Sequence, residues 1–284
     1  AEVGHNHQGS LEKAKQMFAA AKECGCDAVK LQKRHNRTLY TADLYNKPYE
    51  NENSFGATYG EHREALEFGL AEYQELMAYA RELGLIMFAT AFDFISADFL
   101  AGLDIPVYKI ASGDLTNTPL LKYVAGFGKP MIISTGGATM DDVRRAYDAV
   151  MPINSQICLL QCTAAYPATH EELNLRVIET YRKEFPQALV GLSDHENGIA
   201  MALAAYVLGA RVVEKHFTLN HTWKGTDQAF SLEPIGMRKL VRDLRRARTA
   251  LGDGMKSQYP GEKSPIMKMG KKIVAARPLV PGCV

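Results

Sequence analysis

The sequence predicts an α/β protein whose fold is a (β/α)8 TIM barrel. Short apolar runs of strand length alternate with longer segments of helical periodicity. Eight such runs in about 250 residues match the size of an eight-stranded barrel. An open doubly wound sheet is the alternative, but no G-x-G-x-x-G motif follows the first predicted strand.

The predicted strands are nearly continuous apolar runs, as expected for strands buried on both faces. They are residues 1–4, 27–33, 85–92, 106–112, 130–135, 156–162, 188–194 and 210–217. Between them, Thr118 before Pro119 predicts the cap and first turn of a helix. Thr139 stands three residues before Asp142, which predicts a capping box. The last helix is expected from about Pro234 to Leu251.

Two segments depart from this alternation. Residues 34–61 are polar and rich in tyrosine and have no helical pattern, so we expect an ordered lid rather than a linker. The proline-rich tail has no long periodic segment. We therefore expect a catalytic barrel over residues 1–255, and over residues 256–284 a linker with the first strand of a further domain.

Composition excludes several classes of function. The net charge of +1 gives no reason to expect binding to nucleic acid or to a membrane surface. No apolar run reaches the length of a transmembrane helix, and no signal-like segment is recognised at the start. The five cysteines are odd in number and sparse, so we expect them to be reduced in a cytoplasmic protein.

Polar residues at the ends of the predicted strands are the candidates for chemistry, because barrel enzymes build their sites there. The ends of strands are often polar simply because loops begin there. One polar residue at a strand end is therefore weak evidence for a site, whereas polar residues at the ends of all the predicted strands are stronger evidence. Lys30 and Lys109 interrupt apolar strands, and a buried lysine is costly without an anion. With the hydroxyls of Ser134 and Ser193 they predict an anion site, with phosphate as the expected ligand.

Two histidines at the ends of neighbouring predicted strands indicate a metal site. His195 and His216 would lie close enough for their imidazoles to share one ion. Manganese, iron, cobalt and zinc all suit such ligands, so the residues alone do not select the metal. Alternation places Glu214 on the same side as His216. Of the other histidines, His7 is expected to line the mouth and the rest to lie at the surface.

These residues fall in motifs that resemble the sialic acid synthase family. The motifs are AEVGHNHQG, VKLQ, YKIASGD, ISTGG, CTAAYP, GLSDHENG, EKHFTLN and GTDQAFSLEP, in family order across residues 1–234. The resemblance implies a transferase that condenses phosphoenolpyruvate with N-acetylmannosamine to give N-acetylneuraminic acid and phosphate. Relatives that make legionaminic acid, pseudaminic acid or the 9-phosphate are the alternatives. It also implies a homodimer in which a small antifreeze-protein-like domain reaches the partner's site.

The resemblance implies a role for each candidate residue. The phosphoenolpyruvate cradle would be Lys30, Gln32, Lys109, Ser112, Ser134, Gly136 and Ser193. The amino-sugar contacts would be Asn53, Tyr166 and Asp227. His195 and His216 would hold a catalytic Mn²⁺, and Glu2 and Asp114 would be the carboxylates beside the reacting carbons, one of which activates water.

The sequence departs from the family pattern in three places. Ala89 and Ala91 flank Thr90 where S-T-P-F is usual, Gly225-Thr226-Asp227 stands for G-P-D, and residues 34–61 align poorly. Other functions compatible with the barrel are a metal-dependent hydrolase and an aldolase with Lys30 or Lys109 as a Schiff-base nucleophile. A non-catalytic barrel that binds sugar phosphates is the alternative outside enzymes.

Overall fold

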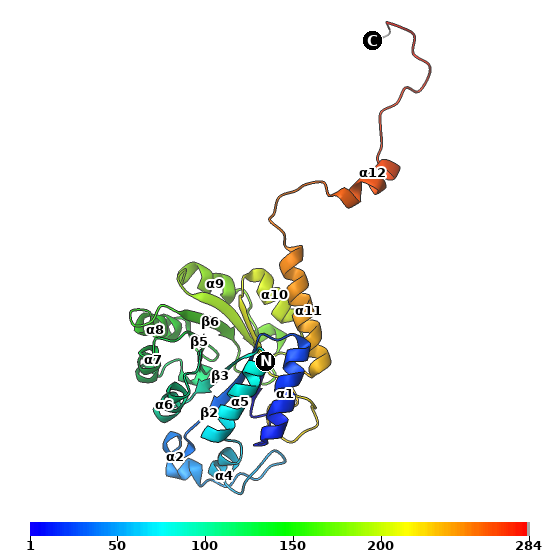
Figure 1. Cartoon of the computed structure of the whole chain (residues 1–284). Coiled ribbons are helices and arrows are strands. Elements are labelled where there is room, and N and C mark those ends of the chain that lie inside the picture. Colours follow the sequence, from blue (N-terminus) through cyan, green and yellow to red (C-terminus); the bar gives the residue numbers. More distant parts are fainter. Residues whose placement is uncertain (283–284) are drawn as a thin grey trace. The chain divides into compact units, whose positions relative to one another are not determined.

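The computed structural model, which describes residues 1–282, confirms the predicted barrel (Figure 1). Eight parallel strands follow one another in chain order within one sheet. They are β1 Glu2–Gly4, β2 Ala28–Lys33, β3 Ile86–Ala91, β4 Tyr108–Ile110, β5 Met131–Ser134, β6 Ile157–Cys162, β7 Leu189–Asp194 and β8 Val212–Lys215. A bridge pairs Glu2 with His216, and the Phe217 N–H donates to Glu2 O at 2.8 Å. This contact closes the barrel between β8 and β1.

The helices surround the strands, and every strand lies within the run predicted for it. The α-helices are α1 Leu11–Cys24, α2 Asn36–Leu39, α3 Ala42–Tyr45, α4 Tyr59–Glu64, α5 Leu70–Glu82, α6 Phe94–Gly102, α7 Thr118–Ala125, α8 Met140–Val150, α9 Val177–Glu184, α10 Ala200–Leu208, α11 Pro234–Ala250 and α12 Lys263–Met269. Three 3₁₀ turns complete the list: η1 Ser112–Asp114, η2 His170–Glu172 and η3 Pro260–Glu262.

The predicted helix boundaries hold with one correction. Thr139 caps α8, and its side chain and that of Asp142 form the capping box. In α7, by contrast, Thr118 is the first helical residue, and the cap is Asn117, whose side chain accepts a hydrogen bond from Leu120 N–H. Asparagine is as good a cap as threonine, which explains the shift by one residue.

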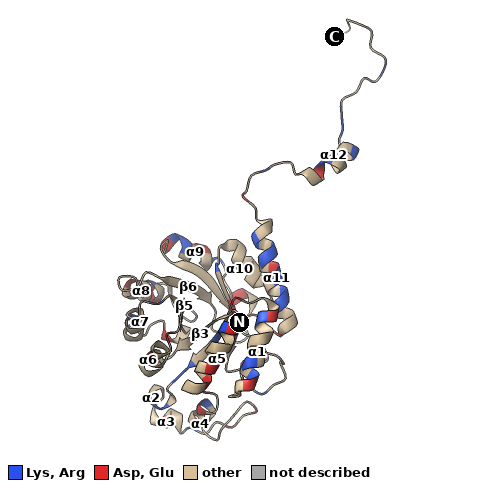
Figure 2. Ribbon diagram, in the orientation of Figure 1, with Lys and Arg blue, Asp and Glu red and all other residues tan. Residues whose placement is uncertain are grey.

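Alternation along each strand divides the side chains between the helix layer and the barrel interior. In β2, Val29 and Leu31 are buried in the hydrophobic core, whereas Lys30 and Gln32 line the pocket at the strand ends. Figure 2 shows many of the other charged residues on the outer helices, most densely along α11. A lysine inside the barrel is therefore unusual and needs partners of its own.

Residues 34–61 do not form the non-helical loop that the sequence predicted. They contain α2, α3 and the start of α4, each too short to show a periodicity of 3.6 residues. Aromatic rings hold the segment together: the Tyr59 ring lies 5.1 Å from that of Tyr40 and 5.4 Å from that of Tyr49. The expectation of an ordered segment therefore agrees with the structure, although the expected backbone conformation was wrong.

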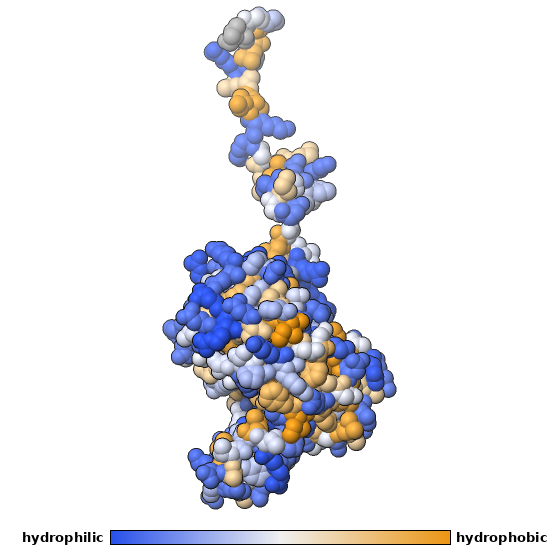
Figure 3. Space-filling view, turned by 90° about the vertical axis from the view of Figure 1, so that its left-hand side faces the viewer, coloured by the Kyte–Doolittle hydropathy of each residue, from blue (hydrophilic) through white to orange (hydrophobic). Residues whose placement is uncertain are grey.

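The chain divides into a compact unit over Ala1–Ala247 and a second unit beyond it. Within residues 248–282 the structure has short helical turns and no strand, so the expected first strand of a further domain is not found there. Among residues 1–282 no helix is both long and apolar enough to cross a membrane. Figure 3 shows hydrophobic residues mixed with hydrophilic ones on one face of the barrel.

The cysteines that the structure describes are free thiols, as predicted. They are Cys24, Cys26, Cys158 and Cys162. Cys283 lies outside the described residues.

Candidate active site

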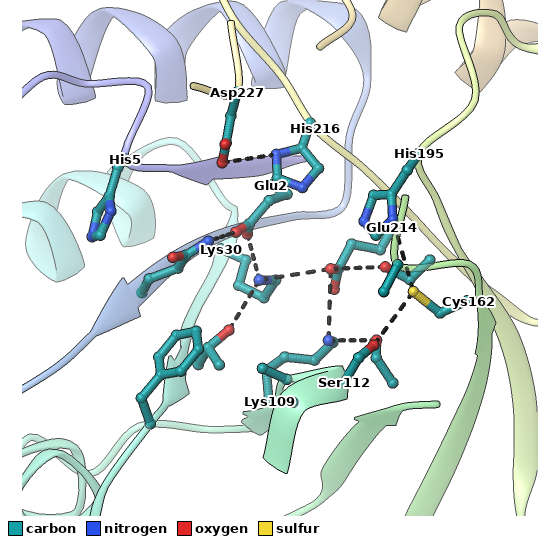
Figure 4. A pocket seen from close by; sticks show the side chains of 18 of the residues that line it. Glu2, His5, Lys30, Lys109, Ser112, Cys162, His195, Glu214, His216 and Asp227 are labelled. Atoms are coloured by element: carbon teal, nitrogen blue, oxygen red, sulfur yellow. Dashed lines mark hydrogen bonds and ion pairs between the residues drawn. The ribbon is translucent and has the colours of Figure 1, made fainter. Parts of the chain in front are cut away.

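A pocket of about 310 Å³ opens at the C-terminal ends of the barrel strands (Figure 4). All eight strands contribute a side chain to it. Most of the residues predicted from the sequence line this one pocket. These are Glu2, Lys30, Gln32, Lys109, Ser112, Ser134, Tyr166, Ser193, His195, His216 and Asp227.

Two buried lysines in the pocket are held by carboxylates and hydroxyls. Lys30 Nζ lies 2.5 Å from Glu2 Oε2 and donates to the Thr90 hydroxyl at 3.0 Å. Lys109 Nζ donates to the Ser134 hydroxyl at 2.7 Å. These partners come from adjacent strands. Glu2 on β1 and Thr90 on β3 flank Lys30 on β2, and Ser134 on β5 neighbours Lys109 on β4.

Glu214 connects the two lysines at the centre of the pocket (Figure 4). Its Oε1 atom lies 3.6 Å from Lys30 Nζ and 3.7 Å from Lys109 Nζ. Burial alone would raise the pKa of Glu214, but the charges of Lys109 and Lys30 lower it to about 2. The lysines thus already have carboxylate partners, which corrects the premise that only an external anion could stabilise them.

The two predicted histidines lie next to each other at the ends of the adjacent strands β7 and β8. The centroids of the His195 and His216 rings are 5.4 Å apart. His195 Nδ1 lies 2.7 Å from Thr163 O, and a carbonyl only accepts, so Nδ1 carries the proton and Nε2 keeps its lone pair. Burial and the charge of His216 lower the pKa of His195 to about 4. Its imidazole is therefore neutral at neutral pH, as a metal ligand must be.

One ring nitrogen of His216 is buried without a hydrogen-bond partner among the described residues. This atom, Nδ1, lies 3.6 Å from Asp227 Oδ2. No group of three or more histidine, cysteine, aspartate or glutamate side chains within residues 1–282 is arranged to hold an ion. His195 and His216 are therefore the residues that could hold a divalent metal, with substrate oxygens or water as the remaining ligands.

An aromatic wall borders the histidine pair. The Tyr166 ring lies 4.1 Å from the His195 ring, and the Phe230 ring lies 4.9 Å from the His216 ring. Tyr166 also contacts Phe230, at 5.2 Å between centroids. These contacts fix the planes of both imidazoles and present apolar ring faces to whatever binds beside them.

Three predicted site residues do not line the pocket. Asp114 lies on η1 and accepts a hydrogen bond from Asn117 Nδ2 at 3.2 Å, and burial raises its pKa. Asn53 accepts from the Gly225 N–H at 2.9 Å and so ties residues 34–61 to the loop that carries Asp227. Gly136 lies behind Ser112 and donates its N–H to the Ser112 hydroxyl at 2.9 Å.

The sequence missed a cationic part of the same pocket. Arg34, Arg63 and His5 line it, although His5 was expected at the surface. His7, expected at the mouth, instead stacks on Phe68 at 4.1 Å outside the pocket lining.

Arg34 directly follows β2, so it could have been predicted in the same way as the other polar residues at the ends of the strands. Arg63 lies on α4. Thr58 and Glu61 form the capping box that begins this helix, a pair the sequence does show, but nothing in the sequence brings the helix to the pocket.

Comparisons with known proteins agree with this geometry. A sequence model described as the NeuB family matches residues 17–256. The chain is 45% identical over 275 residues to the N-acetylneuraminate-9-phosphate synthases of Mus musculus and Homo sapiens, covering 97% of this chain and 77% of each relative. It is 38% identical over 288 residues to N,N'-diacetyllegionaminic acid synthase of Legionella pneumophila, covering 99% of this chain and 81% of that protein.

A solved structure has the same fold. It is the N-acetylneuraminic acid synthetase of Leptospira borgpetersenii in complex with citrate, with a TM-score of 0.81 and 30% identity. The alignment covers 94% of this chain and 89% of that one.

Proposed function

This chain belongs to the NeuB family, and we propose that it condenses phosphoenolpyruvate with the open-chain aldehyde of a 2-acetamido sugar. The products would be a nonulosonic acid and inorganic phosphate. The observation that carries the proposal is the position of His195 and His216 in the same pocket as Lys30 and Lys109. The first pair suits the activation of a carbonyl oxygen, and the second suits the binding of an anion.

The proposed reaction forms one carbon–carbon bond and breaks one carbon–oxygen bond. C3 of phosphoenolpyruvate attacks the aldehyde carbon of the sugar, and the aldehyde oxygen becomes a hydroxyl. Water adds to C2, where positive charge develops, and releases a proton. The resulting tetrahedral carbon loses its phosphate group as C2 becomes the ketone of the product.

His195 and His216 would hold a divalent ion, for which Mn²⁺ is our expectation. When bound, such an ion acts as a Lewis acid toward an aldehyde oxygen. Lys109, with the hydroxyl of Ser134, would bind the phosphate group of phosphoenolpyruvate throughout the reaction, a fixed electrostatic contribution. Tyr166 and Asp227 would then contact the sugar from the opposite wall.

Glu2 is the carboxylate we propose for activating water. Its Oε2 atom is paired with Lys30, and its Oε1 atom accepts from Gln32 Nε2 at 2.7 Å. These contacts hold the carboxylate in one orientation in the pocket, which general-base catalysis requires. Asp114 was the other candidate, but it does not line the pocket.

N-acetylmannosamine is the acceptor expected from the sequence, and its 6-phosphate and the diacetamido sugars are the alternatives. The decisive experiment measures phosphate release from phosphoenolpyruvate by the full-length protein with Mn²⁺ and a panel of 2-acetamido sugars, with product masses from mass spectrometry. We expect release with at least one acceptor and a product that contains all the carbon atoms of both substrates. Binding of phosphoenolpyruvate without release for any acceptor would instead identify a non-catalytic binding protein.

The matched controls separate chemistry from folding. His216→Ala should abolish turnover, whereas His170→Ala removes an imidazole that does not line the pocket and should leave turnover unchanged. Unfolding midpoints of both variants show whether the barrel is intact. Turnover that persists in His216→Ala and in strong chelator would favour a Schiff-base reaction at a lysine.

A further inference from the structure

We propose that Asn6, Thr218, Gln228 and Ser231 are positioning residues for Asp227, the carboxylate proposed to contact the sugar. They form one buried hydrogen-bonded network, and none of them lines the pocket. The network holds the segment between β8 and α11 in the conformation that binds the acceptor. This inference rests on the proposed function, because that function gives Asp227 its contact with the sugar.

The segment between β8 and α11 carries two side chains of the active site and, between and beside them, two buried polar side chains. Asp227 lines the pocket, where its Oδ2 atom lies 3.6 Å from His216 Nδ1 (Figure 4). The Phe230 ring lies 4.9 Å from the His216 ring. Gln228 and Ser231 are buried and contact the chain just after β1 instead. Groups that face the pocket and groups that anchor the segment thus alternate within a few residues.

Asn6, which follows β1, is the centre of the network. Its Nδ2 atom donates to Phe217 O at 2.9 Å and to the Ser231 hydroxyl at 2.8 Å. The Ser231 hydroxyl in turn donates to the backbone carbonyl of Asp227. Two side chains therefore connect the end of β1 directly to the backbone of the residue whose carboxylate faces the pocket.

Gln228 makes a second connection between the same parts of the chain. Its Nε2 atom donates to Asn6 O at 3.0 Å, and its Oε1 atom accepts from the Thr218 hydroxyl. A backbone carbonyl only accepts, so the amide must face Asn6 with its nitrogen, which leaves its oxygen for Thr218. Gln228 is 1% exposed and Thr218 is 0% exposed, so solvent cannot replace either hydrogen bond if it is lost.

Closure of the barrel does not depend on this network, because it has backbone contacts of its own. The Phe217 N–H donates to Glu2 O at 2.8 Å. The Leu232 N–H donates to His216 O at 2.8 Å. Between these contacts, residues 218–231 form no helix or strand. The directional bonds of the buried network therefore supply what the backbone contacts do not, which is a fixed conformation of this segment.

The test compares Thr218→Val, which keeps the shape of threonine but removes its hydroxyl, with Thr218→Ser, which keeps the hydroxyl. We expect Thr218→Val to raise the KM of the 2-acetamido sugar that wild type turns over fastest about tenfold, and Thr218→Ser to stay within about threefold of wild type. Calorimetric affinity for phosphoenolpyruvate should stay within about twofold in both variants, because its proposed contacts Lys109 and Ser134 lie on β4 and β5. Thr222→Val is the control, because it removes an exposed hydroxyl of the same segment and should change neither quantity.

Trp223 gives a second measurement, which needs no turnover. It is the only tryptophan of the chain and lies in the same segment, with Lys13 Nζ 4.7 Å from the centre of its ring. We expect the amplitude of its nanosecond motion, measured by time-resolved fluorescence anisotropy, to rise about twofold in Thr218→Val and to stay at the wild-type value in Thr218→Ser. A variant that had only lost global stability would show a lower unfolding midpoint without this local change.

An unchanged sugar KM in Thr218→Val overturns the inference, as do equal losses of affinity for the sugar and for phosphoenolpyruvate. Unchanged motion of Trp223 in this variant also overturns it, whether or not the protein turns over. Release of phosphate by wild type together with an unchanged KM in Thr218→Val would support the proposed function and reject the network. If Thr218→Val does not fold, Ser231→Ala carries the same expectations, because it removes the hydroxyl between Asn6 and Asp227.

Discussion

Lys215 Nζ lies 2.7 Å from Asp194 Oδ2, directly behind the two histidines of the pocket. The two residues are register partners on β7 and β8. Each immediately precedes a histidine that faces the pocket, His195 or His216, while neither lines the pocket itself. Both are 2% exposed. The ion pair therefore ties together the two strand ends that must keep the imidazoles at a fixed separation.

We predict that Lys215→Met weakens Mn²⁺ binding about 10- to 100-fold, the usual effect of losing a residue that orients metal ligands. It also leaves the Asp194 charge buried without its partner, which should cost about 3 kcal/mol of unfolding free energy. Calorimetric titration with Mn²⁺ measures the first effect and urea unfolding the second, and neither needs turnover.

A double variant separates the two effects. Asp194→Leu with Lys215→Met removes both charges and should recover part of the stability but not the metal affinity. The recovery is partial because the buried Glu196 carboxylate also lies 3.8 Å from Lys215 Nζ. Lys129→Met is the control, because Lys129 and Asp104 form an exposed ion pair with an N–O distance of 2.8 Å. Full Mn²⁺ affinity in Lys215→Met would show that the ion pair has no part in positioning the histidines.

Glu214→Gln tests whether the Glu214 carboxylate compensates the charges of the two buried lysines. Lys30 keeps Glu2, but Lys109 loses the carboxylate oxygen at 3.7 Å, so we expect the unfolding free energy to fall by about 3 kcal/mol. The uncompensated lysine should attract an anion more strongly. Millimolar inorganic phosphate should therefore raise the unfolding midpoint of the variant by more than that of wild type.

The control for this prediction is Glu75→Gln, which removes the exposed partner of Lys15. It should change the unfolding free energy by less than about 1 kcal/mol, with no added response to phosphate. If phosphate raised the unfolding midpoint of Glu214→Gln by less than that of wild type, Glu214 would not be the group that balances the charge of Lys109.

Gly136→Ala should disturb, through steric overlap alone, the end of the pocket that we propose to bind phosphoenolpyruvate. An added Cβ would lie 2.9 Å from Ala164 Cβ and 2.9 Å from Ser112 Oγ, both closer than ordinary contacts. We expect a stability loss of about 1–3 kcal/mol and a higher KM for phosphoenolpyruvate as Ser112 is displaced. Gly102→Ala is the control, because a Cβ there has nothing within 4 Å. An unchanged KM would place Ser112 outside the substrate contacts.

The strands and the histidine pair could be predicted because local rules determine them. A run such as 156–162 has the apolar continuity of a strand covered on both faces, and a residue that ends such a strand must face the barrel mouth or the helix layer. His195, His216 and Glu214 follow from that rule without knowledge of contacts across the barrel.

The rest depended on contacts between distant segments. Lys30 seemed to need an external anion because the sequence does not show that the β1–β2 register places Glu2 beside Lys30 and that Glu214 reaches between two lysines. Arg63 comes from a short helix held by tyrosine rings rather than by periodicity, so its approach to His5 could not be predicted. Asp114 was wrongly predicted to line the pocket because it is the last residue of a 3₁₀ turn of which only Ser112 and Gly113 line the pocket.

His7 should make the stability of the barrel depend on pH. Burial, and next the charge of His5, lower the pKa of His7 to about 3, against about 6.5 in an unfolded chain. The unfolded state therefore binds more protons between these values. The contribution is complete above about pH 6.5 and is lost progressively as the pH falls toward 3, by about 2 kcal/mol at pH 5. Urea unfolding between pH 8 and pH 5 measures this change.

The His7→Asn variant isolates this contribution from carboxylates that also titrate in acid. Asparagine can still accept the hydrogen bond that Gly9 N–H donates to His7 Nδ1 at 3.1 Å, but it cannot take up a proton. The variant should be less stable than wild type at pH 8, because it loses the ring stacked on Phe68. Between pH 8 and pH 5 it should lose about 2 kcal/mol less than wild type does. His170→Asn, at an exposed position, should keep the wild-type slope, and a wild-type slope in His7→Asn would mean that His7 is not buried in its neutral form.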